Sequence, residues 1–494
     1  MRLTDQAAAS LFLEKTGVAM QVSALSILAT NPDLDAILKH VGSRLSSLPH
    51  YRKRLAFVPF NLAHPVWVDH EEFDIAEHIT KVELPGDTSV DDLISHAVDI
   101  GTKPLDRTKP LWAMHLVSAK DRDQTILVHV VHLAALDNVT LGEDAHVFFD
   151  LLREPRVAPP EDWTPEAAPS EMDLASEAVK DNTAAFAEQS RRLGSFSEHG
   201  SEMIRRATES VTRFLTEPIC IAPWNQGLVG QAREFRRISV PYLNVRKLRR
   251  KLGGTDNDIV LTVLVEAAAR YLANKSVNAA GRHLRVFCPV KVRREDTSGI
   301  RGSRMSGVFP VADAEPRAVL DRLTEIRWEN ESIKQNREAQ ALQLLSELAP
   351  PLPTIPGVDD ATASRFFGQT PLNWLTFNPI NFFQQFMPGN LATSISSSLP
   401  PAFSQMMAGF NFSAVTANGA QTSLFFAGHE VKEQLFVPAL AGNLGFAVAI
   451  STYAQTLTFN LVADRVLMPD IDMMQSSVEA VTQELMQAAE LSDN

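Results

Sequence analysis

The chain has 494 residues, of which 45% are hydrophobic and 21% are charged. This composition is typical of a globular protein, and the length predicts two or more domains. A formal net charge of −13 argues against a nucleic-acid partner, which usually requires a basic surface. Two cysteines, Cys220 and Cys288, support neither a disulfide framework nor a cysteine-rich metal site. We therefore expect a cytoplasmic protein that needs no metal or other cofactor.

Residues 1–152 mix helical and strand patterns, which predicts a first α+β domain. Residues 57–60 and 65–68 are typical of short strands. Residues 125–136 form an apolar run without acidic or permanently charged side chains, which predicts a buried strand that leads into a turn. His132 and Asp137 stand at the end of this run, where the strand is expected to meet a loop.

Residues 153–230 are predicted to connect two domains. Five prolines between positions 155 and 169 lie among acidic residues, which indicates a linker. The following polar, alanine-rich stretch, residues 171–215, predicts an amphipathic helix that is broken near Gly194 and Gly200.

Residues 231–494 predict a second α+β domain. Helix-capping residues occupy positions 255–258, and apolar residues recur at helical spacing through 259–272. Residues 284–292 predict a strand, residues 446–450 and 457–461 predict a β-hairpin, and residues 471–491 predict a last helix. The fold class is therefore α/β (α+β), with two mixed halves.

One apolar segment needs a partner. Residues 366–428 contain no Asp, Glu, Lys or Arg, and Phe and Met crowd residues 366–412. Such a segment is buried in its own core, in a homo- or hetero-oligomer, or against a lipid or membrane surface. No stretch of the chain predicts a transmembrane helix.

Several blocks of the sequence together resemble one family. His132, with Asp137 five residues later, is similar to the HHxxxDG signature of CoA-dependent acyltransferases. Further blocks match in order along the chain, at residues 3–5, 12–14, 20–22, 65–69, 73–74, 84–86, 104–107, 110–112, 257–258, 289–293, 463–465 and 469–470. On these blocks the chain resembles the bacterial wax ester synthase/acyl-CoA:diacylglycerol acyltransferase family, nearly end to end.

The resemblance implies two chloramphenicol-acetyltransferase-like sandwich domains with a tunnel between them. Acyl-CoA would enter at one mouth, and a long-chain alcohol or diacylglycerol at the other. It also implies contact with the inner membrane or with lipid droplets that is peripheral, for which residues 366–412 are the candidate segment.

The resemblance also assigns roles to single residues. In the family, the second His of HHxxxDG is the general base that deprotonates the acceptor hydroxyl; here Leu133 stands at that position, and Asn138 replaces the Gly. His132 and Asp137 keep their motif positions. Expected substrate contacts are Leu133, Asn138, Trp112 and Arg293, and the structural motif blocks contain Pro110, Leu111, Asn257 and Asp258. Helix capping alone would explain Asn257 and Asp258.

The histidines near Leu133 are poor substitutes for the missing base. On an extended strand His129 lies roughly 13 Å from Leu133, and His132 faces the opposite side. His132 is either an unusual base or, as we expect, a hydrogen-bonded histidine in the core.

A basic run is a candidate phosphate contact. Arg246, Lys247, Arg249 and Arg250 precede Lys251, and such a patch suits CoA phosphates or anionic lipid headgroups. The alternative is a solvated helix face.

Two functions follow. The first is transfer of a fatty acyl group from acyl-CoA to diacylglycerol or a long-chain alcohol. The second is a catalytically impaired paralogue that binds lipid or acyl-CoA, or serves as a partner subunit, because Leu133 cannot accept a proton.

Overall fold

The structure, a computed structural model, describes most of the chain. The described residues are 2–3, 7–8, 10–11, 14, 19–59, 62–136, 146–156, 163–194, 205–206, 209, 213, 217–226, 230–293, 303–340, 409–440 and 444–491. Most of the apolar segment 366–412 therefore lies outside the described residues, as do Asp137 and Asn138.

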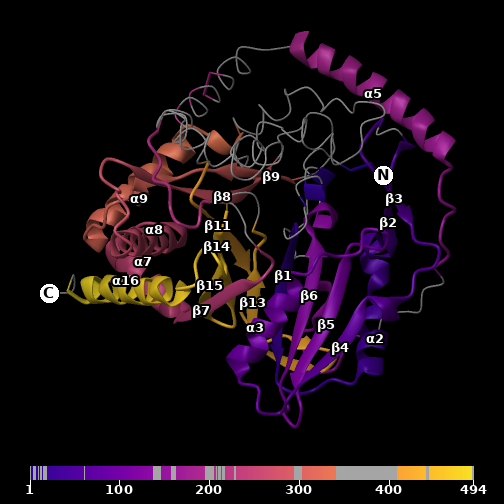
Figure 1. Ribbon diagram of the computed structural model, residues 1–494, viewed down its shortest axis with the longest axis horizontal. Coiled ribbons are helices and arrows are strands. Elements are labelled where there is room, and N and C mark those ends of the chain that lie inside the picture. Colours follow the sequence, from indigo (N-terminus) through magenta and orange to yellow (C-terminus); the bar gives the residue numbers. More distant parts are fainter. Residues whose placement is uncertain are drawn as a thin grey trace.

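A six-stranded sheet organises the first half of the molecule (Figure 1). Its strands, in spatial order, are β12 (Phe425–Phe426), β13 (His429–Val437), β1 (Gln21–Leu28), β6 (Thr125–His132), β5 (Trp112–Ala119) and β4 (Ile79–Leu84). Every residue of β6 is buried, which explains why its sequence is apolar on both faces. Helix α2 (Leu34–Gly42) and the short β2 (Lys53–Ala56) and β3 (Val66–Asp69) complete this half.

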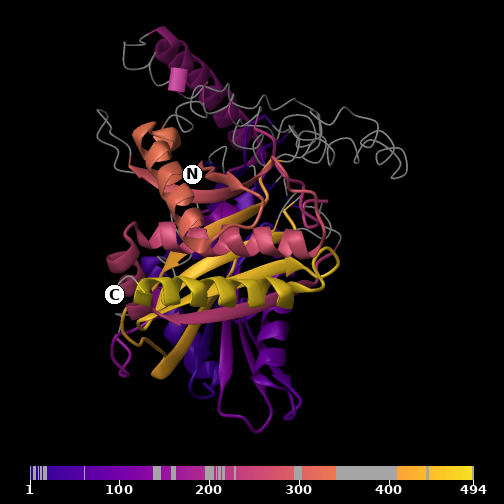
Figure 2. The same cartoon turned by 90° about the vertical axis from the view of Figure 1, so that its left-hand side faces the viewer.

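A second sheet organises the other half. Its order is β10 (Val311–Asp313), β8 (His283–Arg293), β11 (Phe412–Asn418), β14 (Phe446–Tyr453), β15 (Thr456–Asp464) and β7 (Arg233–Pro241), with β9 (Ser303–Val308) paired to β8. The helices α7 (Tyr242–Leu252), α8 (Asp256–Asn274), α9 (Val319–Gln335) and α16 (Ile471–Leu491) lie on one side of it. Figure 2 looks onto these helices.

Helix α3 (Val90–Gly101) lies between the two sheets. Its buried residues share one apolar core with β1 and β6 of the first sheet and with β7, β14 and β15 of the second. Gly101, at its end, is required by close approach, because a Cβ there would lie 2.6 Å from the Ser23 Oγ atom. The two halves are thus joined by packed apolar surface as well as by the chain.

Several sequence predictions are confirmed. Helices α8 and α16 lie where the apolar periodicity predicts them, and β14 and β15 form the predicted antiparallel hairpin. The prediction of a strand at 57–60 is wrong for residues 57–59, the part of it that the structure describes, because β2, the partner of β3, ends at Ala56. Among the described residues, no helix is long and apolar enough to cross a membrane.

The domain boundaries stay a prediction, but the first sheet contains strands from both sides of the predicted boundary at residue 231. Strand β13 pairs antiparallel with β1, and β12 pairs with β13. Both strands come from the range 231–494. The second half of the chain therefore contributes the strands at one edge of the first sheet.

Candidate functional site

The partial HHxxxDG motif lies where β6 ends. The backbone N–H of His132 donates to the Leu111 carbonyl (3.0 Å), and the N–H of Leu133 donates to the Met20 carbonyl (2.9 Å). Residue 133 then begins the 3₁₀ turn η5 (Leu133–Leu136). Residue 133, the position that the family resemblance aligns with the general base, is thus fixed by backbone hydrogen bonds at the junction of strand and turn.

His132 is fully buried, and both of its ring nitrogens have partners. The Nε2 atom lies 2.8 Å from the Glu14 Oε2 atom. The Nδ1 atom accepts the backbone N–H of Ala134 at 3.0 Å. Since an amide can only donate, Nδ1 carries the lone pair and Nε2 carries the proton, which it donates to Glu14. The lone pair that a general base would use is therefore occupied by the turn.

Glu14 connects His132 to a cation. The Arg107 Nη2 atom donates to the Glu14 carboxylate at 2.9 Å and to the Leu11 carbonyl at 2.7 Å. Burial alone would raise the pKa of Glu14, but the hydrogen bonds from His132 and Arg107 hold that pKa below its usual value. The carboxylate is thus kept ionised, as an acceptor that orients the imidazole.

Leu133 is half-buried, and its side chain carries no proton acceptor. His129 does not replace the missing base. It is 4% exposed, and its Nε2 atom lies 2.9 Å from the Tyr51 hydroxyl, on the side of the sheet away from α3. Burial lowers the pKa of His129 to about 3. Its imidazole is therefore a neutral part of the apolar core.

The block that contains Pro110, Leu111 and Trp112 holds the backbone of His132 in place. Leu111 accepts the His132 backbone N–H, and the Trp112 Nε1 atom donates to the Tyr51 carbonyl at 2.7 Å. Trp112 is 2% exposed. The side chain of Trp112 therefore belongs to the core in this structure, and its predicted contact with substrate stays a prediction.

Asp258 holds a helix end. Its Oδ2 atom accepts the Thr255 N–H at 2.7 Å, while the Asp258 N–H donates to the Thr255 Oγ1 atom, so the two residues form a capping box. The other oxygen, Oδ1, accepts the Asn330 side-chain amide at 2.6 Å. Asp258 thus joins α8 to α9, whereas Asn257 is exposed.

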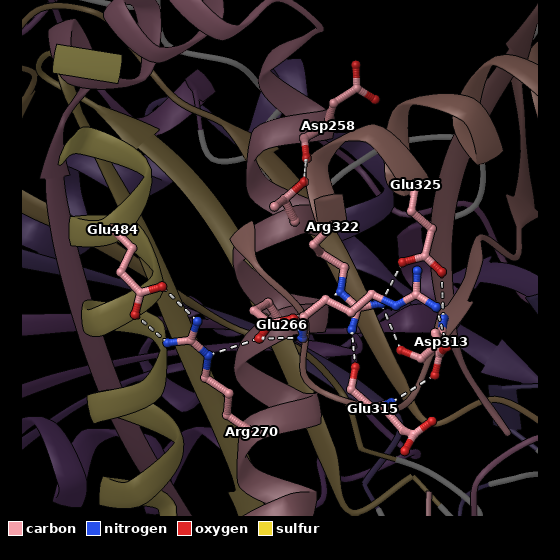
Figure 3. Close-up of polar contacts among 10 residues, drawn as sticks. Asp258, Glu266, Arg270, Asp313, Glu315, Arg322, Glu325 and Glu484 are labelled. Atoms are coloured by element: carbon pink, nitrogen blue, oxygen red, sulfur yellow. Dashed lines mark hydrogen bonds and ion pairs between the residues drawn. The ribbon is translucent and has the colours of Figure 1, made fainter. Parts of the chain in front are cut away.

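Helix α8 also carries a buried ionic network (Figure 3). Glu266 and Arg322 are both fully buried, and the Arg322 Nε atom donates to Glu266 at 3.1 Å. Arg270 connects the other Glu266 oxygen (2.9 Å) with Glu484 of α16 (2.6 and 2.8 Å). The network joins α8, α9 and α16, and its charges are satisfied by one another. We assign it a structural role.

The remaining predicted residues belong to the second half of the chain. Arg293 ends β8, where its backbone pairs with Ser303, and its side chain lies outside the described part of the structure. The predicted phosphate contacts Arg246, Lys247, Arg249 and Arg250 lie together on α7, which packs against α8 and α16. Among the described residues, no cluster of His, Cys, Asp and Glu is placed to hold a metal ion.

Sequence reasoning missed the partners of His132. Glu14 and Arg107 stand 118 and 25 residues before His132 by position (132 − 14 and 132 − 107). Both residues occur inside blocks that carry the family resemblance, and this was the only available signal. The sequence does not show how far Glu14 and Arg107 lie from His132, so only the structure reveals these contacts.

Comparisons with known proteins agree with this fold. The sequence profile described as the wax ester synthase/diacylglycerol acyltransferase catalytic domain matches residues 3–260, and that of the WS/DGAT C-terminal domain matches residues 370–486. A probable diacylglycerol O-acyltransferase of Mycobacterium tuberculosis, tgs3, is 34% identical over 183 residues, which cover 36% of this chain and 68% of that protein. Another from the same organism, tgs1, is 22% identical over 469 residues, or 94% of this chain and 90% of that protein.

Solved structures share the two-domain architecture. The wax ester synthase/diacylglycerol acyltransferase of Marinobacter aquaeolei VT8 superposes with a TM-score of 0.64 at 18% identity, over 99% of this chain and 100% of that one. The first condensation domain of the calcium-dependent antibiotic synthetase gives a TM-score of 0.57 at 11% identity, over 99% and 96%. The predicted fold class is therefore confirmed.

Proposed function

We propose the function of this protein from one premise: the chain belongs to the wax ester synthase/diacylglycerol acyltransferase family. On that premise it is an O-acyltransferase, which moves a fatty acyl group from acyl-CoA to the hydroxyl of diacylglycerol or of a long-chain alcohol. The observation that carries the proposal is the match of the family's catalytic-domain profile to residues 3–260, which include β6 and its turn.

The reaction defines what the site must supply. The acceptor oxygen attacks the thioester carbonyl carbon, a C–O bond forms, and the C–S bond breaks. The hydroxyl proton ends on the CoA sulfur, which leaves as the thiol. A base that carries this proton contributes roughly 10²–10⁴-fold when it is well placed.

In this chain we assign His132 a positioning role. Its protonated Nε2 atom is held by Glu14, and its Nδ1 atom fixes the Ala134 amide of the turn. For His132 to act as the base, Nδ1 would have to release this amide and turn toward the substrate. Glu14, His132 and Arg107 together fix the turn that begins at residue 133.

A second candidate function rests on a specific observation. Leu133 offers no lone pair, and both nitrogens of the adjacent His132 are engaged. A protein with this site could bind acyl-CoA or lipid, alone or as a partner subunit, without transferring the acyl group.

Four proteins separate these functions: the wild type, His132→Ala, Leu133→His and Leu133→Ala, each assayed with labelled oleoyl-CoA and either diolein or hexadecanol. We expect Leu133→His to raise turnover above the wild type and Leu133→Ala not to do so, because only the first restores an imidazole. Wild-type turnover would refute the binding-only function, and its loss in His132→Ala would show that transfer requires His132, either as the base or through the turn that it fixes. Absence of turnover in all four proteins would refute acyl transfer.

Membrane contact belongs to the same proposal. The family resemblance suggests peripheral contact through residues 366–412, and the described part of the chain has no spanning helix. Flotation of the full chain with liposomes, compared with a variant that lacks this segment, tests the contact. Equal flotation of both proteins would refute it.

A further inference from the structure

One side of helix α7 is both basic and apolar. Leu243, Arg246 and Arg250 follow one another at helical spacing, and all three are exposed. Leu243 is 72% exposed. The helix contains no acidic residue, in a chain whose formal net charge is −13. We call these three residues, with Arg249 and Lys251 beside them, the α7 face.

The α7 face is held rigidly toward the outside. Val245 and Leu248 on the opposite side are buried in the core of the second half, and the helix packs against α8 and α16 (Figure 1). Because these contacts fix the rotation of the helix, Leu243 cannot turn into the protein's own core. Its exposure is a property of the folded chain.

The charges of the α7 face are only partly neutralised by the protein. Arg249 pairs with Asp256 at 3.3 Å. Lys247, which is not part of the α7 face, lies 3.7 Å from Glu490. The guanidinium of Arg246 lies 4.8 Å from the Tyr242 ring centroid. Among the described residues, no carboxylate lies within ion-pair distance of Arg250. At least two cations therefore remain available to an anionic partner.

A second large apolar side chain is exposed on α9, the helix that contacts the end of α7 through Arg327. Leu252 is the last residue of α7, and its carbonyl accepts a hydrogen bond from the Arg327 Nη1 atom at 3.4 Å. The next residue, Trp328, is 71% exposed, which is unusual for tryptophan. Basic residues beside an exposed leucine on one side of a helix are typical of segments that lie in the interface of an anionic bilayer, a region where tryptophan is also enriched.

We propose that the α7 face docks the protein on an anionic phospholipid bilayer, with Arg246 and Arg250 at the phosphates and Leu243 inserted among the acyl chains. A bilayer fits better than the phosphates of a single CoA molecule, because small-molecule sites are concave whereas this is the outward side of a helix. The inference does not depend on acyl transfer, nor on residues 366–412.

The test is flotation of the full chain with vesicles of phosphatidylcholine alone and of phosphatidylcholine with phosphatidylglycerol. The measured quantity is the ratio of the two partition coefficients, which isolates the contribution of anionic lipid. Each basic side chain near an anionic surface contributes about fivefold, so Arg246→Gln/Arg250→Gln should lower this ratio roughly 30-fold. Raised salt should lower the wild-type ratio as well, because ions screen the attraction.

A charge-matched control is Lys81→Gln/Lys120→Gln, which removes two exposed lysines on the first half of the molecule. We expect it to leave the ratio unchanged. Leu243→Ser should weaken binding to anionic vesicles about tenfold by removing apolar insertion, although no charge changes. A wild-type ratio near one, or equal decreases of the ratio in both charge variants, would overturn the proposal. It would also be overturned if free CoA suppressed vesicle binding and Leu243→Ser left that binding unchanged.

Discussion

His129 provides a pH-dependent measure of how the first half of the molecule is packed. Its imidazole is 4% exposed and contacts the rings of Tyr51 and Phe148. The Tyr51 hydroxyl lies 2.9 Å from the Nε2 atom. Replacement of His129 by glutamine keeps a hydrogen-bonding amide near this hydroxyl and removes the titration. The change therefore separates the cost of protonation from the loss of packing.

The magnitude follows from the pKa difference. Burial lowers the pKa of His129 from 6.5 to about 3. Since this pKa is lower in the folded state, the unfolded chain binds the proton first, and stability falls as pH drops from about 6.5 toward 3. One pKa unit corresponds to about 1.4 kcal/mol, so the full loss approaches about 5 kcal/mol, of which about 2 kcal/mol is reached at pH 5. Burial lowers the pKa of His40 and His78 as well, in the same direction.

The assay is urea denaturation followed by circular dichroism, between about pH 8 and pH 5. Wild type should lose about 2 kcal/mol more than His129→Gln over this interval, whatever the two stabilities are at pH 8. The exposed His96→Gln is the control, and its pH dependence should match that of wild type. If His129→Gln also loses stability in parallel with wild type, His129 is accessible to protons in the folded state, and its assignment to a dry core is refuted.

Three further pairs of substitutions test the contacts described above, each by thermal unfolding. Glu266→Ala should cost about 3 kcal/mol, because it removes a fully buried carboxylate that pairs with both Arg322 and Arg270. Glu484→Ala, at the half-exposed end of the same network, should cost under about 1 kcal/mol; equal losses would contradict the burial argument. Asp258→Ala should cost about 2 kcal/mol through the lost capping box and its second hydrogen bond, and its exposed neighbour Asn257→Ala should stay within about 0.5 kcal/mol, so a larger effect of Asn257 would point to a role other than capping. Glu14→Ala should cost about 1–3 kcal/mol by leaving a buried imidazole N–H unpaired, and Glu14→Gln should recover part of that loss; no recovery would mean that charge, not hydrogen bonding, holds the site.

The sequence by itself determined the local elements and the family. Helix α8 and the hairpin of β14 and β15 follow from apolar spacing, because a helix and a strand repeat their side-chain directions at fixed short intervals. The same local information places the partial HHxxxDG motif at the end of a buried strand. The family resemblance aligns Leu133 with the second His of that motif, an alignment that needs residue types but no coordinates.

Only the tertiary structure decided which residues meet. Glu14 contacts His132 from a distant part of the chain, and Arg107 contacts Glu14 in turn. Strand β13 crosses from the second half to pair with β1. Such contacts depend on which faces of the sheets and helices pack against one another. The periodicity of a sequence shows that a helix or strand has a buried face, but it does not show which other element covers that face. For the same physical reason, the engagement of the His132 Nδ1 atom by the Ala134 amide became visible only in the folded turn.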